Sequence, residues 1–120
     1  VRKRGIRALP GGDYGFAFNP IGTNARDLEH FVNLFGYSPS EALIAATKLG
    51  GELMGMHLGQ VKEGYLADLL LVDGDPTHDV SILQDRDSFL AIMKDGTFHK
   101  APDPDNLAAR RQIAAPAAAE

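Results

Sequence analysis

The chain has 120 residues, of which 44% are hydrophobic and 23% are charged, and its formal net charge is −4. This composition is typical of one soluble globular domain, and the negative charge disfavours nucleic acid as a partner. The chain has no cysteine, which excludes disulfides and thiolate metal sites, and no apolar run approaches the ~20 residues of a membrane span. We therefore expect a cytoplasmic protein that binds neither nucleic acid nor membrane.

The first predicted element is a short strand over residues 4–13. Pro10 removes a hydrogen-bond donor from the ladder, so the strand should end near it. Gly11, Gly12 and Asp13 follow directly. Residues 14–22 are rich in aromatic side chains and predict a loop at the end of this strand.

The pattern over residues 24–36 predicts the first helix. Asn24 is a suitable N-cap, Asp27 stands three residues later in the capping-box position, and Gly36 ends the segment. One apolar stripe follows the helical period: Leu28, Phe31, Val32 and Phe35. This stripe should face the core.

The second helix has a stronger start signal. Ser38, Pro39 and Glu41 combine a capping box with proline in the first turn. The predicted inner face holds small and branched residues: Ala42, Leu43, Ala46 and Leu49. Gly50 and Gly51 are expected to interrupt this helix.

Strands are predicted after residue 58. Residues 66–72 form a nearly continuous apolar run, which is typical of a strand covered on both faces. Asp68 within that run is interpreted as a carboxylate that accepts backbone hydrogen bonds. Residues 88–93 and 97–100 should pair through a tight turn at Asp95-Gly96, and residues 102–120 should form a flexible tail.

Several of these segments together resemble the closing part of a known family. They are Gly12-Asp13, residues 24–36, the run PSEALIAAT at 39–47 and the run LGQVKEGYLADLLLVDGDP at 58–76. This pattern resembles the C-terminal segment of the amidohydrolase superfamily. It is most similar to the branch of imidazolonepropionase-like enzymes and Xaa-Pro dipeptidases.

The resemblance implies an α/β fold in the complete protein, namely a metal-dependent (β/α)8 barrel flanked by a small β-sandwich. Such a barrel takes about 250 residues, so this chain cannot contain one. By resemblance, residues 1–57 hold the last barrel strand and the helices that follow it, and residues 58–101 hold strands of the sandwich. Taken alone, the chain should be a small α+β unit.

The resemblance also assigns site residues. Asp13 would be the catalytic carboxylate that touches a divalent metal, most simply zinc, and Tyr14, Phe16 and Phe18 could line a substrate pocket. The family usually has Gly-Thr-Asp at this place, whereas this chain has Gly11-Gly12-Asp13. The other family ligands are absent from the sequence, and a zinc site needs three or more. We therefore expect no tight metal binding by this chain alone.

Plainer readings stand beside these assignments. Asp13 could be a turn residue, and the loop aromatics could cover exposed core. Four histidines lack ligand spacing and read as surface or packing residues: His30, His57, His78 and His99. Three aspartates resemble a calcium loop only superficially and favour a turn: Asp73, Asp75 and Asp79.

Two functions remain open. The first is the C-terminal portion of a metal-dependent amidohydrolase that hydrolyses amide or related C–N bonds with a metal-activated water. Its partner would be the missing N-terminal barrel portion, on the same chain or a partner chain. The alternative is a non-catalytic α+β module that self-associates or binds a partner chain. Either way, exposed apolar faces should make the folded chain an oligomer or part of a complex.

Overall fold

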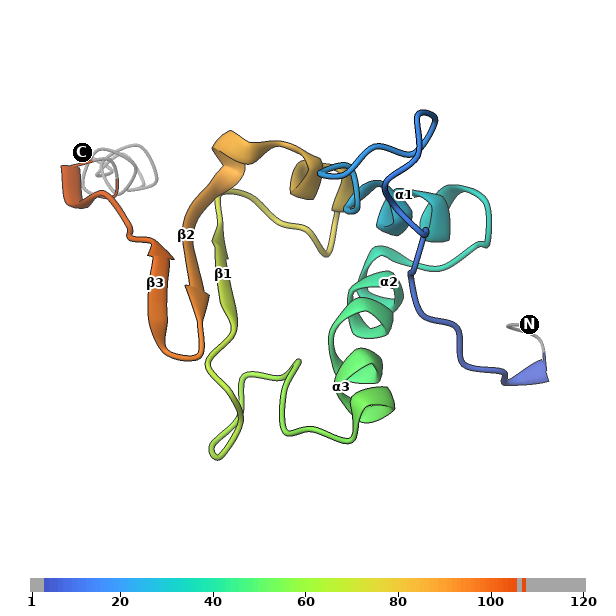
Figure 1. The fold of residues 1–120 in the computed structure, drawn as a ribbon, viewed down its shortest axis with the longest axis horizontal. Helices are drawn as coiled ribbons and strands as arrows, with labels where there is room; N and C mark the ends of the chain where they lie inside the picture. The colour runs from blue at the N-terminus through green and yellow to red at the C-terminus, as the bar shows by residue number, and fades with distance from the viewer. Residues whose placement is uncertain (1–3, 106, 108–120) are drawn as a thin grey trace, which may run out of the picture.

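A computed structural model describes residues 4–105 and 107. The elements follow in this order: α1 (Arg26–Asn33), α2 (Pro39–Ala46), α3 (Lys48–Met54), β1 (Leu69–Val72), the 3₁₀ turns η2 (Val80–Gln84) and η3 (Arg86–Ser88), β2 (Phe89–Lys94) and β3 (Thr97–Lys100). Figure 1 shows the helices on one side of the molecule and the sheet on the other. The predicted α+β unit is confirmed.

Helix α1 begins one residue later than predicted, because its N-cap is Ala25 and not Asn24. Ala25 occupies the N-cap position in a helical conformation and its side chain makes no cap hydrogen bond. Asn24 instead accepts a hydrogen bond from the Gly22 amide at 3.3 Å. The Asp27 carboxylate accepts a hydrogen bond from the Tyr14 hydroxyl. The predicted capping box is therefore wrong here, because both side chains have partners in the preceding loop. The helix ends at Asn33, with Leu34 as its C-cap, and therefore before the predicted end at Gly36, which has φ 71°.

Helix α2 starts as predicted. The Ser38 hydroxyl accepts from the Glu41 amide at 3.2 Å, and the Glu41 carboxylate accepts from the Ser38 amide at 2.8 Å. The buried face differs by one residue, because Ala45 is buried and Ala46 is exposed. The helix breaks at Thr47, not at the glycine pair, and α3 runs through Gly50 and Gly51.

Close backbone approaches explain two of these glycines. A Cβ at Gly51 would collide with the carbonyl oxygen of Leu58, and one at Gly59 would collide with the carbonyl oxygen of Thr47. Gly59 also has φ 76°, a conformation that glycine adopts readily. The loop after α3 therefore packs directly on the junction between α2 and α3.

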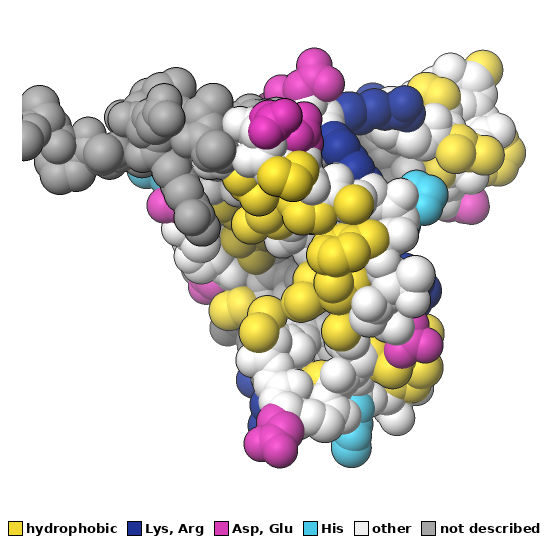
Figure 2. All heavy atoms as spheres, turned by 90° about the vertical axis from the view of Figure 1, so that its left-hand side faces the viewer, with side chains coloured by type: hydrophobic (Ala, Val, Ile, Leu, Met, Phe, Trp, Pro, Cys, Tyr) yellow, Lys and Arg dark blue, Asp and Glu magenta, His cyan; other side chains and the backbone are white. Residues whose placement is uncertain are grey.

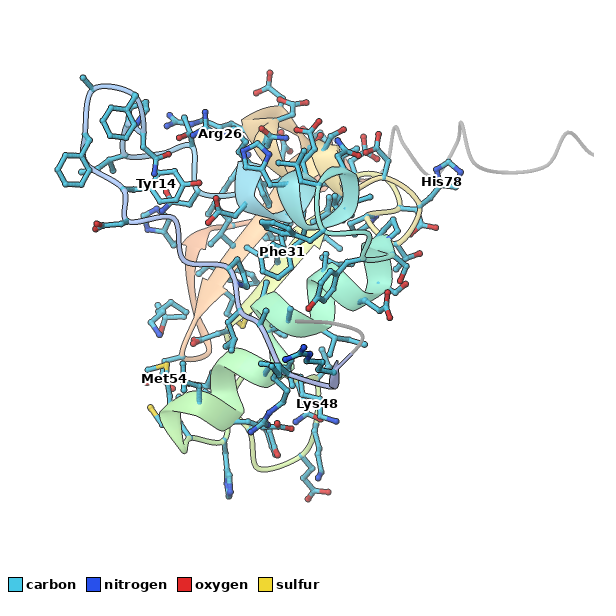
Figure 3. All side chains as sticks on the ribbon, turned by 90° about the vertical axis from the view of Figure 1, so that its right-hand side faces the viewer. Tyr14, Arg26, Phe31, Lys48, Met54 and His78 are labelled. Carbon is cyan, nitrogen blue, oxygen red and sulfur yellow. The ribbon has the colours of Figure 1, made fainter. Side chains whose placement is uncertain are left out.

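The hydrophobic core lies among the helices and one 3₁₀ turn. Its buried members are Leu28 and Phe31 of α1, Ala42 and Ala45 of α2, and Val80 of η2. Figure 3 shows Phe31 pointing in among the helices. Phe35 belongs to the predicted stripe but is 60% exposed, since the helix ends before it.

The three strands of the described residues form an antiparallel sheet in the order β1-β2-β3. Asp95 and Gly96 both have positive φ, 48° and 76°, and make the predicted hairpin turn between β2 and β3. Strand β1 is shorter than predicted and is not covered on both faces. Leu69, Leu70 and Leu71 are 37%, 57% and 46% exposed. Among the described residues β1 has only β2 as a neighbour, so its other edge is free.

Asp68 accepts a backbone hydrogen bond, as the sequence predicted, and in doing so it holds the hairpin turn. One carboxylate oxygen accepts from the Asp95 amide at 2.7 Å, and the other pairs with the Lys94 ammonium at 3.0 Å. The backbone adds a bond from the Gly96 amide to the Ala67 carbonyl at 3.1 Å. The hydrogen bond from the Asp95 amide, and then the contact with Lys94, lower the pKa of Asp68 below its ordinary value.

Within the part of the chain that the structure describes, no helix is long and apolar enough to cross a bilayer.

Candidate active-site loop around Asp13

The chain approaches Asp13 as an extended segment that is tied to the helices. Ala8 packs against the helical core, and the Arg7 guanidinium pairs with Glu52 of α3 at 2.8 Å. Residues 6–15 do not form the predicted strand in this structure. A strand exists only through hydrogen bonds to a neighbour, and no other described segment pairs with these residues. Their role as a barrel strand remains a prediction for the complete protein.

Asp13 lies at the end of this segment in a left-handed conformation, with φ 50°. Its side chain is exposed and lies at an open depression of about 530 Å³. The lining comes from the segment, the loop and the start of α1: Pro10, Gly11, Gly12, Asp13, Tyr14, Ile21, Asn24 and Asp27. The depression therefore holds two carboxylates, of which the sequence pointed only to Asp13.

Tyr14 joins the loop to α1. Its hydroxyl donates to the Asp27 carboxylate at 2.6 Å, and Figure 3 shows the ring in the loop on the side that faces Arg26. Burial raises the pKa of Tyr14, and the hydrogen bond to Asp27 and the negative charge of Asp27 raise it further. The Tyr14 hydroxyl is therefore a protonated donor at neutral pH, and its ring remains part of the depression.

Asn19 makes a second connection between the loop and α1. Its side-chain amide donates to the Gly12 carbonyl, and its side-chain oxygen accepts from the Arg26 guanidinium at 2.6 Å. The loop closes on itself through two backbone bonds of 2.9 Å, from Gly15 to the Asn19 carbonyl and from Asn19 to the Phe16 carbonyl. The residues on either side of Asp13 are thus connected to α1 by hydrogen bonds, while Asp13 itself remains exposed.

The loop tip carries exposed aromatic side chains. Phe16 and Phe18 are 53% and 84% exposed, and their rings stack with centroids 5.9 Å apart. Ile21, also 83% exposed, belongs to the lining of the depression. The predicted pocket residues Tyr14 and Phe16 therefore lie in the same loop as Asp13, which is compatible with contact to an apolar substrate group.

The residues present do not fit a metal site on their own. In residues 4–105 and 107 no group of three or more histidine, aspartate or glutamate side chains is placed to hold a metal ion. Asp13 and Asp27 line the same depression, but Asp27 is engaged with Tyr14 and Asp13 has no further protein ligand beside it. A metal at Asp13 would need ligands from outside the described residues.

The aspartates after β1 are turn residues, as predicted. Asp75 accepts hydrogen bonds from the Thr77 amide at 2.8 Å and the Thr77 hydroxyl at 2.6 Å. Asp79 caps η2 by accepting from the Ser81 amide at 2.9 Å. These bonds lower the pKa of both carboxylates, since they stabilise the charged form.

Sequence reasoning missed Asn19, Arg26 and the loop partner of Asp27. Asp27 was assigned to a capping box because that pattern depends only on local spacing. Its actual partner, Tyr14, is 13 residues away. The available signal was Asn19-Pro20 after the aromatic run, since asparagine before proline favours a turn that brings the loop back to α1.

Comparison with known proteins gives a family match and several relatives. The model of the family described as "Amidohydrolase family" matches residues 13–99. Ochratoxinase from Aspergillus niger is 31% identical over 86 residues, which is 69% of this chain and 18% of that protein. Imidazolonepropionase from Rubrobacter xylanophilus is 33% identical over 85 residues, which is 66% of this chain and 20% of that protein.

Comparison with solved structures gives matches to enzymes of related name. A Xaa-Pro dipeptidase crystallised with methionine in its active site superposes with a TM-score of 0.60 at 30% identity. The match covers 67% of this chain and 19% of that one. The chain thus spans about one fifth of the length of the proteins that it matches.

Proposed function

This chain belongs to the amidohydrolase family, and from that premise we propose that it is the C-terminal part of a metal-dependent hydrolase. The reaction is hydrolysis of an amide or related C–N bond by a metal-activated water. The observation that carries the proposal is the family match over residues 13–99, which begins at Asp13. That residue presents an exposed carboxylate at the open depression.

The rest of the active site must come from outside this chain. A divalent metal, which we take to be zinc, would supply a water whose pKa is lowered toward about 7. Asp13 can contribute one ligand, and we expect the others from the barrel portion that the family resemblance implies, outside the residues that the structure describes. The proposal therefore concerns the complete protein, whether its barrel portion lies on the same chain or on a partner chain.

Asp13 has a role of its own in this reaction. A carboxylate oxygen at the end of a barrel strand can accept a proton from the attacking water and return it to the leaving nitrogen. This role needs a carboxylate that is accessible and not already neutralised by a cation. Asp13 is exposed, and none of the ion pairs among the described residues involves it.

Tyr14 and Phe16 would contact the substrate. The stacked rings of Phe16 and Phe18 give the loop an apolar surface beside the depression. Relatives of the chain are named ochratoxinase and Xaa-Pro dipeptidase, and these names define the first compounds to test. We infer a substrate with an apolar or aromatic group next to the C–N bond that is cleaved.

The test uses the complete protein with zinc and three kinds of compound: Xaa-Pro dipeptides, imidazolonepropionate and ochratoxin. We expect hydrolysis of at least one of them and a loss of about 10²–10⁴-fold in kcat for Asp13→Asn. Asp87→Asn, which changes an exposed carboxylate of η3, is the matched control and should leave kcat unchanged. Full activity of Asp13→Asn would overturn the assignment.

We also propose that the sheet is completed by a partner, either the barrel portion or a second copy. Strand β1 has a free edge among the described residues, and its leucines are exposed. Figure 2 shows hydrophobic side chains gathered on the side of the molecule that carries the sheet. Light scattering of the isolated chain should therefore give a mass above the 12.9 kDa of one copy. A monodisperse monomer would contradict this.

The alternative function, a non-catalytic α+β module, gains no support from relatives that are named as enzymes.

A further inference from the structure

Two side-chain pairs tie the backbone around Asp13 to the first turn of α1. In the first, the Tyr14 hydroxyl donates to the Asp27 carboxylate at 2.6 Å. In the second, Arg26 donates to the Asn19 side chain at 2.6 Å, and the other end of Asn19 donates to the Gly12 carbonyl. The residues on both sides of Asp13 are thus fixed to consecutive residues of one helix.

Gly12 makes the first pair possible. A Cβ at this position would lie 2.6 Å from the Tyr14 ring and 2.9 Å from the Asp27 carboxylate. These separations are shorter than carbon atoms and carboxylate oxygens tolerate, so the Tyr14–Asp27 pair packs directly on the backbone before Asp13. Gly11 is different, because a Cβ there would meet nothing within 4 Å. The two neighbouring glycines therefore form a matched comparison.

Asp13 itself needs such support. Its φ of 50° is disfavoured for a residue with a Cβ, and conformations of this kind persist when the surroundings fix them. Among the described residues, the surroundings are the two pairs and a 3.4 Å hydrogen bond from the Asn19 side-chain amide to the Asp13 carbonyl, while the Asp13 side chain is exposed.

We propose that Tyr14, Asp27, Asn19 and Arg26 are positioning residues, which hold Asp13 in its left-handed conformation so that its carboxylate faces the depression. This inference rests on the proposed function, because it assumes that Asp13 takes part in the reaction. It adds a residue, Asp27, whose carboxylate works through Tyr14 and does not touch the substrate. It also gives the Tyr14 hydroxyl a role separate from any contact that the ring makes with substrate.

The kinetic test measures kcat and KM of the complete protein with the best compound of the panel above. Tyr14→Phe keeps the ring and removes the donor, and it should lower kcat about 10–100-fold with KM nearly unchanged, as loss of a supporting hydrogen bond does. Tyr65→Phe is the control, since that tyrosine stacks on His57 far from the loop. A rise in KM with kcat unchanged would overturn the positioning role of the hydroxyl.

Two further variants separate the pair from a general structural effect. Asp27→Asn keeps an oxygen that can accept from Tyr14 and should retain most of kcat, whereas Asp27→Ala should fall as far as Tyr14→Phe. The double variant Tyr14→Phe/Asp27→Ala should be no slower than either single variant, because both remove the same interaction. Additive losses would contradict the pair. Gly12→Ala should also lower kcat, and by more than Gly11→Ala does, because only the Cβ at Gly12 would meet the pair.

A second readout does not depend on activity. Hydrogen exchange of the Gly15 and Asn19 amides, which close the loop, should become faster in Tyr14→Phe and Asn19→Ala and stay unchanged in Tyr65→Phe. Unchanged exchange in the loop variants would overturn the inference.

The kinetic results distinguish failure of this inference from failure of the proposed function. If Asp13→Asn is inactive while the pair variants keep normal kcat, only the positioning inference fails. If Asp13→Asn is fully active, the proposed function fails instead.

Discussion

The helical part of the molecule and its sheet differ in how they bury apolar side chains. The helical part, made of α1, α2, α3 and η2, surrounds its own core, with Phe31 7% and Ala42 0% exposed. The sheet of β1, β2 and β3 has one buried apolar residue, Ala91, among those described, and Phe98 and the β1 leucines are exposed. Helices can cover one another within a short segment, whereas a three-stranded sheet needs a second layer. The described chain thus has one part that is packed and one that is open.

The largest effect should come from breaking the packed part. Phe31→Ala removes a ring that packs between Phe35 and Tyr37, with centroids 5.5 and 5.0 Å away, and should lower the free energy of unfolding by about 3–5 kcal/mol. Phe98→Ala makes the same change in β3 at a side chain that is 50% exposed, and should lower it by less than about 1 kcal/mol. Urea unfolding of both variants measures the difference.

Equal losses for the two phenylalanine variants would show that the sheet is packed in solution. A partner that covers β3 is one such case, and it would be visible as a larger mass in the same sample. The comparison between the two parts would then hold only for the chain without its partner.

The next effect tests the loop that closes the helical part. Gly59→Ala places a Cβ against the Thr47 carbonyl oxygen, and Gly64→Ala, at a similar φ of 80°, meets nothing within 4 Å. Both variants carry the strain of a left-handed alanine, roughly 1–2 kcal/mol. Gly59→Ala should be less stable than Gly64→Ala by about a further 1–3 kcal/mol, the usual effect of overpacking. Thermal unfolding of the two variants gives this difference, and identical values would mean that the loop moves away freely.

Local signals in the sequence predicted the fold well where the partner groups are close along the chain. The capping box of Ser38 and Glu41 and the turn at Asp95-Gly96 depend on residues within a few positions, and both were confirmed. The prediction that β1 is buried on both faces was wrong for this chain, because its leucines are exposed. An apolar run indicates that a strand is buried, but it does not show which part of the protein buries it.

The candidate site could be predicted only in part for the same reason. Asp13 and the aromatic loop were identified from a family pattern, but the conformation of Asp13 and the Tyr14–Asp27 pair depend on contacts across 13 residues. The helix break at Thr47 was also missed, since Gly50 and Gly51 are the stronger breakers in sequence. Gly51 is retained inside α3 because the Leu58 backbone needs its space, which only the folded chain reveals.

A smaller effect is expected from the two predicted N-caps, of which Ser38 caps α2 and Asn24 does not cap α1. Ser38→Ala should lower the free energy of unfolding by about 1 kcal/mol, because the Glu41 amide loses its acceptor. Asn24→Ala should change it by less than about 0.5 kcal/mol, since Asn24 does not cap α1. Chemical denaturation of both variants checks the contrast. A loss at Asn24 as large as that at Ser38 would mean that α1 starts earlier in solution than at Arg26.

The smallest effect belongs to the sheet and depends on pH. The Asp95 amide and Lys94 hold the pKa of Asp68 below its ordinary value of 3.8, so the charged form of Asp68 is the one that stabilises the hairpin turn. This stabilisation is fully present above pH 3.8 and should be lost as the pH falls below that value through the lowered pKa. The Asp95 amide resonance in NMR should report the change, with a midpoint below 3.8. In Asp68→Asn the side-chain oxygen can still accept from that amide but cannot titrate, so the component of the shift that comes from Asp68 should vanish. A midpoint at or above 3.8 in the unaltered chain would mean that the turn is open in solution and that Asp68 does not hold the sheet's hairpin there.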